Sequence, residues 1–545
     1  MGCSASTGAS APPRASAPRS PQFTDVGFSR YSGWLSNDDV MSSFSCTTLE
    51  EAQHRAFELR PNGCVGFCFE DVRQRGAGSF PTLCYFHKDF SLAGDAFTSY
   101  RIDLLDDYEA EQSENVSLQT SELCKQLTSR AAFDAPSFNE AVQELLAGAL
   151  NIDERTALIL EIGALRLLSA KWLLAQVQDY KIERFQDLPQ KAFLSPGKAA
   201  RLFRKDGGIV VMSYGWLTRR HPDPRGHHLK TLKLYLQAHL YTGWFCHDDI
   251  GVFWDYSCNP QSPRTKSEDA VFKVGLTAMN LLYGAPTTTV VQLKELDAMD
   301  AALYEDVNRS EYNDRGWCFT EEAMASVVKP SRFLLNLQSA TAELADGADW
   351  GAVMRAGTAS RHPPMPPELL TKTLLDPEMV TFTNSSDPEL VSELYKKFFF
   401  ELCCRAHNLV FTRFGPLQWG PAEVAQLSCC LPWFEACENL NIEGHALGDE
   451  GAHHLAEALP RLRNLHHVNL CSCQIGDAGV GSLAKALRNM PPCFWHLKLS
   501  GDNHFNKEGL AELRQVMDSF KHLGMPERLG PLCSGAGMAF AAALA

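Results

Sequence analysis

Polar and aromatic residues gather where two apolar runs of the chain come to an end. The run 209–214 reads IVVMSY, and the run 251–255 reads GVFWD. Short apolar runs separated by segments of helical spacing predict buried strands of a parallel sheet. Ligands of such sheets bind beyond the carboxyl ends of the strands. The residues at or just past these two ends are Ser213, Tyr214, Trp216, Asp255 and Gln261, and we expect them to contact a substrate.

A carboxylate further along the chain is the candidate catalytic group. The segment 314–323, DRGWCFTEEA, predicts a helix that begins near Trp317, with Glu321 one turn later on the same face. A carboxylate stabilises a positive charge that develops during a reaction, and an indole stacks on a cationic ring. Because Glu322 is adjacent, the two carboxylates are interchangeable at this point. In the structural alternative, Trp317 is core and Glu321 is a solvated carboxylate favoured by the helix dipole.

Helices and two further strands are expected to position these residues. Leucines recur at helical spacing over 229–240, and Thr265 with Glu268 forms a capping box that predicts a helix start. The runs 287–293 and 332–337 predict the third and fourth strands. We therefore assign residues 206–345 to one α/β domain with a parallel sheet.

At these residues the domain resembles two related families. In the Toll/interleukin-receptor (TIR) fold, which is flavodoxin-like, a Ser-Phe/Tyr pair ends the first strand and a Trp-Cys…Glu pattern opens a later helix. Ser213-Tyr214 and Trp317, Cys318 and Glu321 match these. The fungal heterokaryon-incompatibility domain has the pattern Ser-Tyr-x-Trp-Gly, then Trp-x-Asp-x-x-Cys-x-x-Gln, then Arg-x-Trp-x-x-x-Glu. The matching residues here are Ser213, Tyr214, Trp216, Asp255, Cys258, Gln261, Arg315, Trp317 and Glu321.

The resemblance implies an activity and an alternative to it. Enzymatic TIR domains cleave the nicotinamide–ribose bond of NAD, and the resemblance carries their essential glutamate onto Glu321. NAD is then a substrate, and no cofactor is expected. Other TIR domains only self-associate and signal, so a non-catalytic scaffold is the second interpretation.

The N-terminus carries a lipidation pattern. The chain begins MGCSAS, so Gly2 fits N-myristoylation and Cys3 stands where a palmitate is added. Residues 1–22 are rich in Ala, Ser and Pro and predict a disordered tether. Two acyl chains anchor a protein stably. We expect the cytoplasmic face of a membrane, or the cytoplasm when the N-terminus is unmodified.

Two segments separate this tether from the central domain. Residues 23–105 contain Cys46, Cys64, Cys68 and Cys84, a helix pattern and apolar strands. This small α+β module resembles PAN/apple modules, which bind ligands or proteins, although a purely structural role fits equally well. Residues 106–205 predict a helical segment, whose best part is one helix over 152–177.

The C-terminal part contains repeats. Residues 346–430 predict a helical or irregular connector, with a helix start at Asp387. Residues 431–525 carry three copies of LxxLxLxxCxI, one of them at Leu465, Val468, Leu470, Cys473 and Ile475. Each is followed by an amphipathic segment, so the region resembles leucine-rich repeats of the ribonuclease-inhibitor type. Such repeats bind protein partners, although three units also serve as a structural cap. Residues 526–545 are a tail.

Composition excludes several classes of function. A net charge of −15 argues against a nucleic-acid binder. No apolar run approaches the roughly 20 residues of a membrane span. The 18 cysteines show no CxxC pair or zinc-finger spacing, and there is no HExxH motif, so we predict no metal site. The sequence indicates a multi-domain α/β protein.

Overall fold

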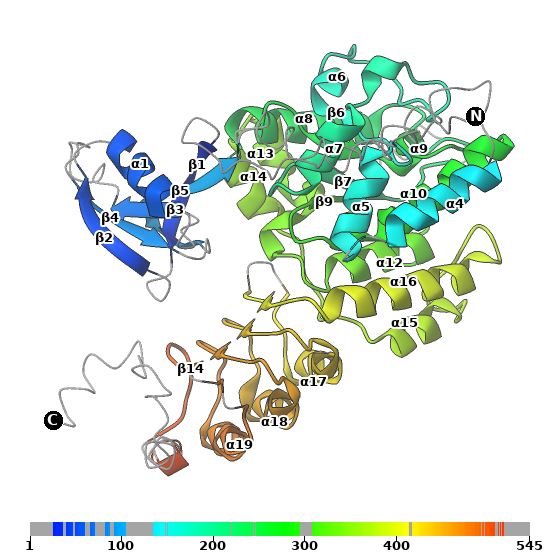
Figure 1. The fold of residues 1–545 in the computed structure, drawn as a ribbon. Helices are drawn as coiled ribbons and strands as arrows, with labels where there is room; N and C mark the ends of the chain where they lie inside the picture. The colour runs from blue at the N-terminus through cyan, green and yellow to red at the C-terminus, as the bar shows by residue number, and fades with distance from the viewer. Residues whose placement is uncertain are drawn as a thin grey trace, which may run out of the picture. The chain divides into compact units, whose positions relative to one another are not determined.

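The chain divides into two compact units in the computed structural model (Figure 1). One unit holds residues 1–125 and 244–246, and the other holds 126–243 and 247–545. The residues described are 26–35, 40–46, 49–59, 66–70, 82–87, 92–104, 135–147, 149, 151–218, 220–243, 245, 247–294, 308–413, 417–491, 493–494, 496–506, 509, 511, 513 and 515–516. The predicted lipidation sites, Gly2 and Cys3, lie outside them. No helix among the described residues is both long and apolar enough to span a bilayer.

The first unit contains an antiparallel sheet and a helix. The strands are β1 (Val26–Leu35), β2 (Val40–Cys46), β3 (Gly66–Glu70), β4 (Thr82–His87) and β5 (Leu92–Leu104), in the order β1-β5-β3-β4-β2. Helix α1 (Leu49–Leu59) buries Ala52 and Ala56, which lie one turn apart. The helix and two of the strands fall where the cysteine-containing module predicts them. Cys46, Cys68 and Cys84 lie in β2, β3 and β4, whereas Cys64 lies outside the described residues.

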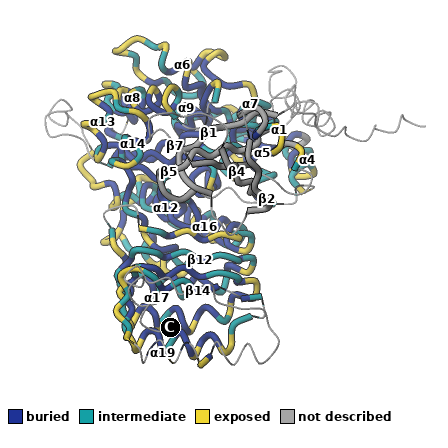
Figure 2. The backbone as a smooth tube through the Cα atoms, turned by 90° about the vertical axis from the view of Figure 1, so that its left-hand side faces the viewer, coloured by how far each residue is buried: buried dark blue, intermediate teal, exposed yellow. Residues whose placement is uncertain are grey.

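The second unit is built on a five-stranded sheet that is mostly parallel. Its order is β10 (Leu334–Asn336), β9 (Thr289–Leu293), β7 (Ile209–Tyr214), β8 (Gly251–Phe253) and β6 (Leu168–Ser169). The first four are parallel, and β6 pairs antiparallel with β8 at the edge. All six residues of β7 are buried (Figure 2), as expected for an inner strand covered on both faces. The four predicted strands are therefore present.

Helices surround this sheet. They are α4 (Ala135–Ala147), α5 (Ile152–Glu161), α6 (Ala170–Leu174), α7 (Pro196–Phe203), α8 (His227–Thr242), α9 (Asp255–Cys258), α10 (Lys266–Gly284), α12 (Gly316–Ala325), α13 (Thr341–Ala345), α14 (Trp350–Gly357), α15 (Pro367–Leu374) and α16 (Asp387–Cys403). Helices α5, α12 and α16 pack on α10, whereas α6, α13 and α14 pack on α8. The predicted helix start at Asp387 is confirmed.

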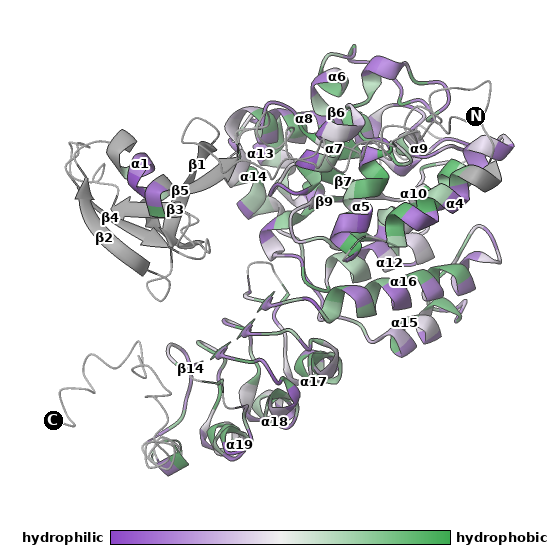
Figure 3. Cartoon of the chain, viewed as in Figure 1, coloured by the Kyte–Doolittle hydropathy of each residue, from purple (hydrophilic) through white to green (hydrophobic). Residues whose placement is uncertain are grey.

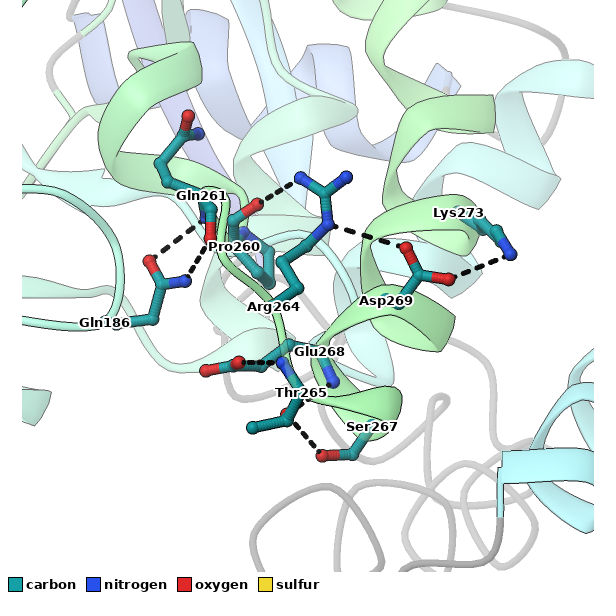
Figure 4. Close-up of polar contacts among 9 residues, drawn as sticks. All are labelled: Gln186, Pro260, Gln261, Arg264, Thr265, Ser267, Glu268, Asp269 and Lys273. Carbon is teal, nitrogen blue, oxygen red and sulfur yellow. Dashed lines mark hydrogen bonds and ion pairs between the residues drawn. The ribbon is translucent and has the colours of Figure 1, made fainter. Parts of the chain in front are cut away.

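The predicted capping box at the start of α10 is also confirmed. The backbone N–H of Thr265 donates to Glu268 Oε2 at 2.7 Å, and that of Glu268 donates to Thr265 Oγ1 at 3.2 Å (Figure 4). Two N–H groups that lack a partner within the helix are thereby satisfied.

The predicted single helix over 152–177 is wrong. Helix α5 ends at Glu161, and Gly163 then adopts a φ of 77°. Glycine reaches this left-handed conformation without a Cβ clash. The chain continues into β6, where Leu168 pairs with Val252. Leu165 and Leu168, which continue the helical spacing, therefore lie in a turn and in an edge strand, where both are buried. The segment that we predicted to be helical contributes a strand to the central sheet.

The C-terminal region repeats one strand and one helix. Its parallel strands are β11 (Asn408–Val410), β12 (Asn439–Asn441), β13 (His467–Asn469) and β14 (His496–Lys498). The helices are α17 (Pro421–Cys430), α18 (Gly448–Ala458) and α19 (Asp477–Leu487), and each carries hydrophobic and hydrophilic residues (Figure 3). A buried ladder runs through Leu409, Leu440, Val468 and Leu497. The unit formed by β11 and α17 lies within the predicted connector, and the sequence analysis did not detect it.

Asp449 joins two successive units of this stack. Its Oδ1 atom accepts the backbone N–H groups of Gly476 at 2.7 Å and Gly479 at 2.9 Å, where α19 begins. Asp449→Ala removes this cap and is expected to cost about 1 kcal/mol of the free energy of unfolding. Glu450→Ala, a change at the exposed neighbour, is the control. Equal urea midpoints for the two variants would contradict the capping role.

Candidate functional site

Ser213 and Glu321 meet at the carboxyl end of β7. Ser213 is fully buried, and its hydroxyl donates to Glu321 Oε2 at 2.5 Å. Glu321 lies in the second turn of α12 and keeps part of its side chain exposed. The structure therefore places this carboxylate at the tip of β7.

The start of α12 is anchored to the sheet by Arg315. Its guanidinium donates to the carbonyl oxygen of Trp216 at 2.9 Å and to that of Ser310 at 2.9 and 3.1 Å. The arginine crosses directly over Gly215, where a Cβ atom would lie 2.2 Å from Arg315 Nη1. A side chain at position 215 would displace this guanidinium, whose hydrogen bonds fix the start of α12 relative to the residues that follow β7.

A second carboxylate lies at the tip of the neighbouring strand. Tyr214 donates its hydroxyl proton to Asp255 Oδ1 at 2.6 Å and accepts a bond from Trp254 Nε1 at 2.7 Å. The indole of Trp216 also bonds Asp255. The site thus contains two carboxylates, each held by the last residues of β7 or their neighbours.

Burial and mutual repulsion favour the protonated form of Glu321. The pKa of Glu321 is raised to about 8: removal from water is the largest cause, the charge of Asp255 raises the pKa further, and the contacts with Ser213 and Tyr283 lower it. Burial also raises the pKa of Asp255, against the hydrogen bonds from Tyr214 and Trp216. Two neighbouring acids with raised pKa values are more typical of a functional site than of a surface.

Glu322 has a separate, structural role. Both of its oxygens accept hydrogen bonds from Lys294 Nζ at 3.0 Å, and its side chain is buried. The two glutamates that the sequence left interchangeable therefore face different partners, and only Glu321 contacts the end of β7.

Two of the predicted substrate-binding residues bond elsewhere. The amide of Gln261 donates to the carbonyl oxygens of Asp255 at 3.1 Å and Asn259 at 3.0 Å, and Gln186 holds its backbone (Figure 4). Gln261 therefore shapes the loop after α9. Trp317 donates its indole N–H to Asp387 Oδ2 at 2.9 Å, toward α16.

Three further residues of the site were missed by the sequence analysis. Tyr283 of α10 contacts Glu321, and its hydroxyl donates to the carbonyl oxygen of Met212 at 3.0 Å. Tyr312 bonds Ser213, and Gln292 of β9 donates to the Tyr312 hydroxyl at 3.5 Å. Only Gln292 gave a usable signal, because it lies near the carboxyl end of the third predicted strand. The two tyrosines reach the site through long-range packing.

No group of three side chains suited to hold a metal ion occurs in the part of the chain that the structure describes. In comparisons with known proteins, no family model and no curated protein matches the chain.

Proposed function

We propose that the central domain is a TIR-like domain that hydrolyses NAD at the nicotinamide–ribose bond. The observation that carries this proposal is the Glu321 carboxylate, bonded to Ser213 at the tip of β7 and close enough to Asp255 for their charges to interact. Two carboxylates at adjacent strand tips suit a substrate whose ribose becomes positively charged during reaction.

The reaction breaks the bond between C1′ of the ribose and the nicotinamide nitrogen. The bonding electrons leave with nicotinamide, water adds to C1′, and one proton is released. Ionised Glu321 stabilises the positive ribose and orients its hydroxyls. Because the pKa of Glu321 is about 8 in the free protein, a cationic nicotinamide ring must favour loss of the Glu321 proton on binding. The value of kcat/KM, which follows the free protein, is therefore expected to rise with pH up to about 8.

The direct test is to measure release of nicotinamide from NAD by the purified full chain. The protein is clustered by using a concentration high enough for the chains to self-associate. A rate that increases with pH and depends on Glu321 supports the proposal. No release from clustered protein counts against it.

A non-catalytic scaffold is the second candidate function. The hydroxyls of Ser213 and Tyr214 favour this candidate, because both donate their protons to carboxylates of the protein and so have none for a substrate. In that case the domain self-associates in a concentration-dependent manner, and Glu321→Gln leaves the association unchanged in sedimentation.

The C-terminal stack supplies the recognition part in this proposal. Its four parallel strands and the helix that follows each of the first three suit leucine-rich repeats of the ribonuclease-inhibitor type, which bind protein partners. The proposal assigns the sensing of a protein partner to this stack and the output to the central domain.

Lipidation of Gly2 and Cys3 would hold the protein at the cytoplasmic face of a membrane. Gly2→Ala is expected to abolish labelling by a myristate analogue and to move the protein to the soluble fraction. Cys3→Ser is expected to keep the myristate, but one chain binds membranes only marginally, so most of the protein should also leave the membrane. Unchanged labelling of the Gly2 variant would contradict the assignment.

A further inference from the structure

A chain of hydrogen bonds runs from β9 to Glu321. Gln292 and Ser213 are neighbours in register on β9 and β7. The Gln292 amide donates to the Tyr312 hydroxyl at 3.5 Å, Tyr312 bonds Ser213, and Ser213 donates to Glu321 at 2.5 Å. Gln292 and Ser213 are fully buried, and Tyr312 is only 4% exposed. Water has little access to this chain, so its members depend on one another for partners.

Proton bookkeeping fixes the direction of the chain when Glu321 is ionised. Each hydroxyl has one proton. Ser213 gives its proton to the carboxylate, so its oxygen must accept the proton of Tyr312. The oxygen of Tyr312 then accepts from the amide of Gln292. All bonds point toward the negative charge, and such aligned bonds strengthen one another.

The amide oxygen of Gln292 takes no part in this chain of hydrogen bonds when Glu321 is ionised. Its Oε1 atom is buried and has no hydrogen-bond partner among the residues that the structure describes. A buried acceptor without a partner is costly and calls for an explanation. When Glu321 is protonated, the chain can reverse: Glu321 donates to Ser213, Ser213 to Tyr312, and Tyr312 to the amide oxygen after the amide turns over. Each end of the amide is thus used in one of the two states.

We propose that Gln292, Tyr312 and Ser213 form a reversible hydrogen-bond relay that holds Glu321 and controls whether it is ionised. Tyr312 and Gln292 are positioning residues, since neither contacts Glu321 directly. The relay stands on its own geometry, whereas its role in catalysis rests on the proposed hydrolysis of NAD.

The other groups around the relay limit what can titrate with Glu321. The titratable groups that act on Glu321 or Tyr312 are Tyr214 of β7, Asp255 of α9, Tyr283 of α10, and Cys318 and Glu322 of α12. Lys294 lies over the Tyr312 ring at 5.0 Å and is paired with Glu322. From α16, Asp387 bonds Trp317 instead of Glu321. Burial raises the pKa values of Tyr214, Tyr283 and Tyr312, and also that of Cys318, so these groups stay neutral near pH 8.

The test is a titration of the Glu321 carboxyl group in the full chain by carbon NMR, with the signal assigned by its loss in Glu321→Gln. Tyr312→Phe removes the proton that Ser213 accepts, so Ser213 becomes a weaker donor. The midpoint is expected to rise by about half to one pH unit. Gln292→Met should raise it by less, because its bond is the longest of the chain.

Tyr395→Phe is the matched control. Tyr395 is equally buried, and its hydroxyl donates to the carbonyl oxygen of Met365 at 2.8 Å, outside the relay. An unchanged or lowered midpoint in folded Tyr312→Phe overturns the relay. If that variant does not fold, the same outcome in Gln292→Met overturns it.

The activity readout separates the relay from the proposed function. If nicotinamide is released, the rise of the rate with pH should shift by the same amount as the midpoint in Tyr312→Phe. An unshifted pH profile of release overturns the relay and leaves the hydrolase intact. A shifted midpoint without any release supports the relay and overturns the hydrolase.

Discussion

Glu321→Gln is expected to make the folded protein more stable than wild type at pH 8, with the advantage vanishing near pH 4.5. The pKa of Glu321 is raised from 4.5 to about 8, so the folded state holds an extra proton between these values. Wild-type stability must then fall as pH rises through this window. Glutamine keeps the size and hydrogen bonds of the protonated acid but does not ionise, so the variant lacks this loss.

The size of the effect is limited by linkage and by solvent. One group changes the free energy of unfolding by at most about 1.4 kcal/mol per pH unit. Glu321 is only partly buried, so the total difference should be smaller than this slope would give over the whole window. Urea unfolding of both proteins between pH 4.5 and 8 gives the difference directly. Parallel stability curves would show that Glu321 ionises normally in the folded state.

Arg361→Ala is expected to cost about 3 kcal/mol or more of the free energy of unfolding. Arg361 is buried, and its acceptors among the described residues are carbonyl oxygens: it donates to Ser326 at 3.2 Å and to Val410 at 2.5 Å. Its own carbonyl oxygen accepts the indole N–H of Trp419 at 2.7 Å. Its guanidinium also lies over the ring of Phe411 at 4.3 Å. The side chain therefore ties the C-terminal end of α12 to the first strand of the repeat stack.

Losing Arg361 leaves the buried carbonyl oxygen of Ser326 without its donor and also removes the hydrogen bond to the carbonyl oxygen of Val410. Relief of the buried charge offsets part of this cost, since burial lowers the pKa of Arg361 to about 9. Hydrogen exchange should accelerate at both α12 and β11. Arg355→Ala, at an exposed arginine of α14, is the control and should be nearly neutral. A loss no larger than that of the control would show that the two regions are not coupled through Arg361.

Local signals predicted much of the central sheet from the sequence. Continuous apolar runs located β7 to β10 because buried parallel strands tolerate few polar residues. The capping box at Thr265 and the Asp-Pro start at Asp387 located two helices, since both are local signals. The capping box acts through hydrogen bonds within four residues, whereas Pro388 acts through its fixed backbone angle. Helix spacing predicted only that Glu321 shares a helix face with Trp317, and no local pattern placed its carboxylate on Ser213.

Features that depend on distant contacts escaped prediction. Gly163 ends a helical pattern that its neighbours would continue, and the reason is the pairing of β6 with β8. Tyr283 is one of the partners of Glu321, but no spacing or motif in the sequence links the two residues. Trp317 shares a helix with Glu321, yet its indole donates a hydrogen bond to Asp387, which is 70 residues away along the chain. Side-chain partners of this kind are set by packing, and no local pattern records them.

The most direct test of the central proposal is nicotinamide release from NAD by clustered full-length protein, compared among wild type, Glu321→Gln and Glu322→Gln. Glu322 is the matched control because it is the adjacent glutamate and is paired with Lys294. We predict release by wild type, a loss of at least about a hundredfold in Glu321→Gln, and release by the Glu322 variant wherever it stays folded. Equal rates for wild type and folded Glu321→Gln, or no release by any of the three, would contradict the proposal.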